Sequence, residues 1–310
     1  MRNKLLTPSL VAALGLTAGA AQAAPYMTNG QELWKFQNLE QINPAAVGNQ
    51  EQAWGILQMQ SISDGQILIQ HDLISGGNIT KFSNSANGQI TGMFYGLQST
   101  PCGPTGGQLC ATGGALDMYW DEPGLTGGGT MISIAGSLPG SRSGPTTYTG
   151  YTDGIFLVHL VFASGGVPGS SLVTLNGSSL PPTSGLANGF LDVDPTYEVN
   201  SQLGLWANAL NLDWFWPNIS FAPVGLPGTP PYAAGPTCTT GNTTQCARDL
   251  RFDDRYTAYP AWDGPAGSGI SGAYSNDPVQ VFAATPEPTS LALISLGLLG
   301  LGFGMRRKSA

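Results

Sequence analysis

The chain has 310 residues, of which 10% are charged and 41% are hydrophobic, and 44 are glycines. Its formal net charge is −8, and such an acidic surface is expected to repel nucleic acid and anionic lipid. The apolar share excludes a disordered chain. Few charges and many glycines instead predict short strands joined by many turns.

The N-terminus has the three parts of a secretory signal peptide. Arg2 and Lys4 supply the positive charge, an apolar segment follows, and Ala21 and Ala23 form a small-residue cleavage pattern. We expect export through the Sec translocon and cleavage by signal peptidase, so that the mature chain begins at Ala24. Residues 1–23 are therefore left out of the fold, and an extracytoplasmic β-rich domain is expected over residues 24–284.

The body is expected to consist mainly of β-strands. Residues 154–162 are almost continuously apolar, which predicts a central strand buried on both faces. The sequence Ser63-Asp64-Gly65 predicts a hairpin turn. Runs of apolar residues between turn residues predict further strands over 53–62, 66–74, 89–97, 115–120, 130–135, 171–176, 190–199 and 279–282.

Three further segments have weaker patterns. Residues 32–40 fit either a short helix or a first strand, and residues 201–215 fit a strand or a pair of strands. Residues 235–280 have few apolar runs and are expected to form long loops. Many short strands separated by turns favour a mainly β protein, with an antiparallel β-sandwich and long Gly/Pro-rich loops as the predicted fold.

The four cysteines form two pairs of equal spacing, each C-x7-C. Exported proteins can keep disulfides. Of the three possible connectivities, we favour the two local ones, Cys102 with Cys110 and Cys238 with Cys246. Each would stabilise the fold by about 2–3 kcal/mol in the loop-entropy model. A metal site is not favoured, because no C-x2-C motif occurs and the two histidines are distant in sequence.

The motifs of several enzyme classes do not occur, so we expect no enzymatic activity. There is no G-x-S-x-G, H-E-x-x-H or Walker motif. The G-x-G-x-x-G match at residues 267–272 lacks a strand before it and a helix after it, and is expected to be a loop. His71, beside Asp72, and His159 could serve as general bases, but a structural role is favoured for both. An extracellular hydrolase remains an alternative function.

Two acidic groups are candidate ion sites. Asp192, Asp194 and Glu198 lie at alternate positions of a predicted strand and could hold Ca²⁺, the one cofactor that the sequence suggests. The same carboxylates would serve the hydrolase alternative. In the second group, Asp249 and the pair at positions 253–254 lie among arginines, and we expect surface ion pairs there.

Aromatic residues suggest a carbohydrate-binding module as a further alternative. Trp214 and Trp216 share one face of a predicted strand and could stack on sugar rings if they are exposed. Because tryptophan is highly buried on average, the core is the favoured place for them. The stretch from Tyr256 to Trp262 is a second candidate platform.

The C-terminal tail has three parts in a fixed order, and it is predicted to be a sorting signal over residues 285–310. An uncharged apolar run predicts one transmembrane helix at about 289–305, although it is slightly short of the ~20 residues that span a bilayer comfortably. Basic residues after the run are expected to stay cytoplasmic. The short motif before the run is Pro286, Glu287 and Pro288, and the basic tail is Arg306, Arg307 and Lys308.

This tail resembles the PEP-CTERM sorting signal of Gram-negative bacteria. The resemblance implies recognition by exosortase, a membrane peptidase-transpeptidase that cleaves near the Pro-Glu-Pro motif. It also implies a precursor held transiently in the inner membrane, a mature form at the cell surface or in the extracellular matrix, and a host that makes exopolysaccharide. We therefore expect a surface or biofilm-matrix protein, with exosortase as a partner and exopolysaccharide as a candidate ligand.

Overall fold

The computed structural model describes residues 30–64, 68–69, 72–73, 80–83, 88–100, 108–122, 124, 127–163, 174–178, 184–210 and 249–283. These residues belong to one compact unit, Thr28–Ala284. The expected signal peptide, sorting tail and transmembrane helix lie outside the described residues. Within the described part of the chain, we find no helix with the length and apolar character needed to cross a membrane.

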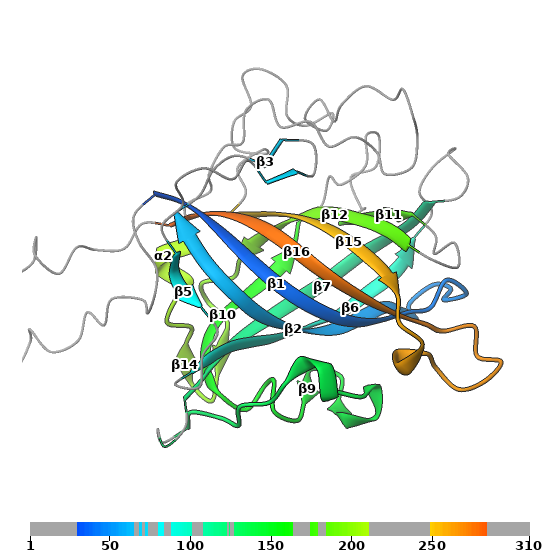
Figure 1. Cartoon of the computed structure of the whole chain (residues 1–310), viewed down its shortest axis with the longest axis horizontal. Coiled ribbons are helices and arrows are strands. Elements are labelled where there is room, and N and C mark those ends of the chain that lie inside the picture. Colours follow the sequence, from blue (N-terminus) through cyan, green and yellow to red (C-terminus); the bar gives the residue numbers. More distant parts are fainter. Residues whose placement is uncertain are drawn as a thin grey trace, which may run out of the picture. The chain divides into compact units, whose positions relative to one another are not determined.

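A single antiparallel sheet of ten strands dominates this unit, and eight of its strands form a closed circuit (Figure 1). Each of the eight pairs with the next in chain order, and the last pairs with β1, which also pairs with β2. The circuit is therefore a meander in which every connection joins neighbouring strands. Its members are β1 (Gly30–Ile42), β2 (Glu51–Asp64), β6 (Gln89–Thr100), β7 (Gln108–Asp121), β10 (Ile155–Phe162), β12 (Ser184–Val193), β15 (Leu250–Ala258) and β16 (Ser271–Ala283).

Two shorter strands complete the sheet. Strand β11 (Leu175–Ser178) pairs with both β7 and β12, beyond the part of β7 that pairs with β10, so β10 and β11 share one strand position. Strand β5 (Thr80–Ser83) pairs with β2. The other described elements are β3 (Leu68–Ile69), β4 (Asp72–Leu73), η1 (Ile134–Gly136), η2 (Pro139–Ser141), β8 (Arg142–Gly144), β9 (Thr147–Tyr148), β13 (Glu198–Val199), β14 (Gln202–Leu203), α2 (Ala207–Leu210) and η4 (Pro260–Trp262).

Both faces of the sheet are buried in part, because side chains alternate between the interior of the circuit and its outside. On the inner face, Trp34 of β1 packs against Trp206, with ring centroids 5.2 Å apart. On the outer face, Leu39 and Trp54 belong to a second cluster. Residues 128–154, here called the cover segment, contribute to that cluster with Ile134, Tyr148 and Tyr151, and η4 contributes Trp262.

Polar contacts attach the cover segment to the outer face. Arg142 forms a two-hydrogen-bond ion pair with Glu51 of β2, at 2.6 and 3.1 Å. Its guanidinium also lies 4.4 Å from the ring centroid of Trp54. Trp262 Nε1 donates a hydrogen bond to the Ser137 carbonyl oxygen at 2.8 Å. The cover segment and η4 thus form a second layer over one side of the sheet.

The prediction of a mainly β protein is confirmed, and so are strands at the positions of 53–62, 89–97, 115–120 and 154–162. A sandwich is not confirmed, because the eight strands form one continuous sheet rather than two packed sheets. The ambiguous segment 32–40 is a strand, within β1.

Other predicted elements are wrong or incomplete. Residues 130–135 contain the turn η1 instead of a strand, and residues 207–210 are the short helix α2. In the segment 66–74, the structure describes only the two-residue strands β3 and β4. The segment 235–280, predicted as loops, contains β15 and the first part of β16.

Candidate functional site

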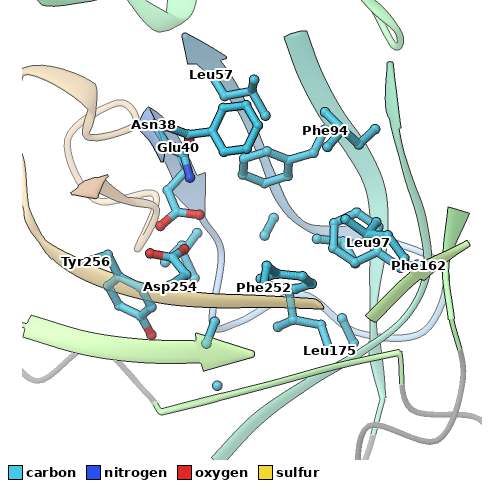
Figure 2. A pocket seen from close by; sticks show the side chains of 18 of the residues that line it. Asn38, Glu40, Leu57, Phe94, Leu97, Phe162, Leu175, Phe252, Asp254 and Tyr256 are labelled. Carbon is cyan, nitrogen blue, oxygen red and sulfur yellow. The ribbon is translucent and has the colours of Figure 1, made fainter. Parts of the chain in front are cut away.

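The interior of the closed sheet contains a cavity of about 90 Å³. It lies on the same face of β1 as Trp34, and every strand of the circuit contributes to its wall. Most of the wall is apolar, and Figure 2 shows Phe94, Leu97, Phe162, Phe252 and Leu175 on one side of the two carboxyl groups, while Tyr256 lies on the other side, beside Asp254. Among these apolar residues are Phe36, Leu57, Phe94, Leu97, Phe162, Leu175 and Phe252.

The other side of the cavity carries two carboxyl groups. Glu40 of β1 and Asp254 of β15 are 5% and 9% exposed, and their carboxyl ends point toward one another in Figure 2. Alternation along β1 places Glu40 on the cavity face together with Phe36 and Asn38. Glu40 Oε1 is buried and has no hydrogen-bond partner among the residues that the structure describes. The cavity therefore combines an apolar wall with an acidic end.

Burial controls the ionisation of this acidic end. Removal from water raises the pKa of Glu40 well above its ordinary value, and the nearby Asp254 raises it further. Two carboxyl groups that share a site of low dielectric constant do not both ionise readily. A positive charge or a hydrogen-bond donor beside Glu40 would therefore stabilise its carboxyl group in this apolar interior.

A second polar cluster lies on the outer face of the sheet. His159 Nδ1 is 2.5 Å from Asp117 Oδ1, and both side chains are buried. Tyr95 donates a hydrogen bond from its hydroxyl to Asp117 Oδ2 at 2.9 Å. The ring of Tyr197 stacks on the imidazole of His159, with centroids 3.8 Å apart. Burial, and then the nearby carboxylate of Asp117, raise the pKa of Tyr95.

This cluster lacks part of what nucleophilic catalysis requires. A histidine that activates a nucleophile needs a serine, threonine or cysteine within hydrogen-bond distance, and a third group that orients the ring. Asp117 can orient His159, but no hydroxyl or thiol group is hydrogen-bonded to His159 within the described ranges. The arrangement fits the structural role predicted for His159.

The three acidic residues predicted for Ca²⁺ differ in their burial. Asp194 Oδ1 accepts hydrogen bonds from the backbone nitrogen and the hydroxyl of Thr196, at 2.9 and 2.7 Å. Asp192 is half-buried on β12, whereas Glu198 is exposed on β13. Among the described residues, no group of three His, Cys, Asp or Glu side chains could hold a metal ion.

Other predicted site residues are buried or fall outside the described ranges. Tyr256 lines the cavity and Trp262 is fully buried, so neither of these two rings is exposed for stacking on a sugar, whereas Tyr259 between them is half-buried. Cys110 is buried and is not a free thiol, but both disulfide pairings stay predictions. Residues outside the described ranges are His71, Cys102, Trp214, Trp216, Cys238, Cys246, Pro286, Glu287, Pro288, Arg306, Arg307 and Lys308, and the expected cleavage residues Ala21, Ala23 and Ala24.

The cavity carboxyl groups are the residues that sequence reasoning misses. The expectation that Asp254 takes part in a surface ion pair is wrong for its position, since the side chain is buried and lines the cavity. Glu40 attracts no attention in the sequence, because a single acidic residue in a strand usually faces solvent. Its position two residues after Asn38 and four after Phe36 is the one available signal, and it requires knowing which face of β1 is inside.

Comparison with known proteins identifies the tail. Residues 284–308 match the PEP-CTERM protein-sorting motif, which confirms the resemblance found in the sequence. This motif belongs to exported precursors that are anchored in the membrane and processed by exosortase. No curated protein and no solved structure matches the chain. The match is confined to the tail.

Proposed function

We propose that the mature chain is a non-enzymatic protein of the cell surface, associated with the exopolysaccharide or biofilm matrix. The observation that carries this proposal is the sorting motif at residues 284–308, which directs a protein to exosortase and the cell surface. A low content of charged residues, 10% of the chain, is compatible with a hydrated matrix of neutral sugars. The absence of a nucleophile beside the described His159–Asp117 pair supports a non-enzymatic role.

Replacement of Glu287 by alanine tests the sorting step. We expect nearly all of the variant to remain as an uncleaved precursor in the inner membrane, because the Pro-Glu-Pro motif is the part that exosortase would recognise. Immunoblotting of membrane and exported fractions reports both the mass and the location of the chain. Ser290→Ala, just beyond the motif, is the matched control and should be processed normally. A Glu287→Ala chain with normal mature mass and normal release would refute the assignment.

Association with the matrix is tested separately, with the processed chain. We expect it to co-sediment with the host's own exopolysaccharide. Loss of co-sedimentation in Trp216→Ala would instead support the alternative function, a carbohydrate-binding module that uses Trp214 and Trp216. Hydrolysis of the polysaccharide that is lost in His159→Ala would instead establish the hydrolase alternative. A processed chain that does not bind the polysaccharide would contradict the matrix role and leave the sorting result unaffected.

A further inference from the structure

We propose that the cavity inside the closed sheet binds a small aliphatic amine. Glu40 and Asp254 hold the ammonium group, and the apolar side of the cavity holds the short hydrocarbon chain. This binding site goes beyond surface sorting and does not depend on it. The inference stands on the size of the cavity, its apolar wall and its two buried carboxyl groups (Figure 2).

The cavity volume limits the ligand to a few non-hydrogen atoms. About 90 Å³ is available, which is less than the ~150 Å³ of an engineered apolar cavity that binds benzene. An unbranched chain of about four carbons is the kind of body that such a space accepts. The wall offers it the rings of Phe94 and Phe252 and the side chain of Leu57, which exclude water from the chain but provide no hydrogen bonds.

The acidic end selects the charge of the ligand. Two carboxyl groups that share an apolar interior do not both ionise readily, because the negative charge of one raises the pKa of the other. An ammonium group brings a positive charge to this acidic end, and an opposite charge nearby favours the ionised form of a buried carboxyl group. A carboxylate ligand would add a negative charge, and a diamine would place its second ammonium group against the apolar wall.

Hydrogen-bonding capacity also favours an ammonium group over other small groups. Glu40 Oε1 is buried without a hydrogen-bond partner in the described part of the chain, and an unsatisfied buried acceptor is costly. An ammonium group has three donors and no acceptor. It can therefore satisfy this oxygen and the facing carboxyl group of Asp254 at the same time, whereas an alcohol has one donor.

Isothermal titration calorimetry of the processed chain with n-butylamine at neutral pH tests the proposal. We expect saturable binding of n-butylamine at one site. The ligands 1-butanol, butyrate and 1,4-diaminobutane have similar length but differ in charge, and each should bind at least about tenfold more weakly. Glu40→Gln keeps the size of the side chain but replaces one carboxyl oxygen by an amide NH2 group, which cannot ionise or accept a hydrogen bond from an ammonium group. It should therefore weaken n-butylamine binding by at least about tenfold.

Two further variants complete the test. Glu198→Gln removes one negative charge from an exposed position outside the cavity and should bind n-butylamine as the unmodified chain does. Asp254→Asn should weaken n-butylamine binding as Glu40→Gln does. If circular dichroism shows that one of these two variants is poorly folded, the other still tests the proposal. Equal binding of 1-butanol and n-butylamine, no saturable binding of n-butylamine, or unchanged binding in both cavity variants would overturn the proposal.

Discussion

Replacement of Trp262 by alanine is expected to lower the free energy of unfolding by about 3–5 kcal/mol, the usual cost of removing a large buried aromatic side chain. Trp262 is fully buried and its ring lies 5.5 Å from that of Trp54 and stacks with Tyr148 at 6.2 Å. Its indole nitrogen also donates to the Ser137 carbonyl oxygen. One side chain therefore joins η4, the cover segment and the outer face of β2.

Urea unfolding, followed by tryptophan fluorescence and circular dichroism, measures this effect. Trp262→Phe should cost less than Trp262→Ala, because it keeps most of the ring contacts and loses mainly the hydrogen bond to Ser137. Leu203→Ala removes an exposed apolar side chain and should change the free energy of unfolding by no more than about 0.5 kcal/mol. If Trp262→Ala were as stable as Leu203→Ala, the cover segment would not be packed on the sheet as described.

The sequence predicts a strand well when one face is apolar and the other polar, or when both faces are apolar. The run 154–162 is apolar throughout and forms β10, which is buried along most of its length. Strand β15 is missed because its inward positions, Phe252, Asp254 and Tyr256, include a charged residue. This charge hides the alternation that marks a strand.

Closure of the sheet depends on information that no local pattern contains. The pairing of β16 with β1 joins residues that are 229 to 253 positions apart, from Ile42 with Ser271 to Gly30 with Ala283. The cover segment and η4 then bury the outer face of β2, where Trp54 and Ile56 are fully or nearly buried. A strand with both faces buried fits a sandwich, a closed sheet or a covered sheet equally well, so its pattern cannot choose among them.

The candidate sites also include one that the sequence predicts and one that it does not. The tail is predictable because its motif, apolar run and basic residues are adjacent in sequence, and the match to residues 284–308 confirms it. The cavity is not predictable, because Glu40 and Asp254 meet only through the order of the strands. Asp192, Asp194 and Glu198 are close in sequence, but among the described residues no group of three His, Cys, Asp or Glu side chains could hold a metal ion, so Ca²⁺ binding by these three residues stays a prediction.

Asp121 is a buried carboxyl group whose ionisation should make the stability of the fold depend on pH. Its Oδ2 accepts hydrogen bonds from Thr91 Oγ1 at 2.8 Å and Gln89 Nε2 at 3.3 Å. Its Oδ1 lies against the backbone of the cover segment, where a Cβ atom at Gly129 or Gly154 would collide with it. Burial raises the pKa of Asp121 from 3.8 to about 7, although these hydrogen bonds act against the increase.

The free energy of unfolding should therefore fall as the pH rises from about 4 to about 7. In this interval the unfolded chain has lost the Asp121 proton while the folded chain keeps it, and stability decreases with pH wherever the folded state binds more protons. A pKa difference of about three units corresponds to about 4 kcal/mol. Burial raises the pKa of Glu40 in the same direction, so this second carboxyl group contributes a decrease of the same sign.

Comparison with Asp121→Asn isolates the effect of Asp121 from that of Glu40. Urea unfolding at pH 4, 5, 6, 7 and 8 should show the variant becoming progressively more stable relative to the unmodified chain, with a gain of roughly 3 kcal/mol between the extremes. The matched control is Glu198→Gln, which changes an exposed carboxyl group on β13. The free energy of unfolding of this control should equal that of the unmodified chain at every pH. A stability difference between Asp121→Asn and the unmodified chain that stays constant from pH 4 to pH 8 would show that Asp121 is already ionised in the folded protein at pH 4, contrary to its burial beneath the cover segment.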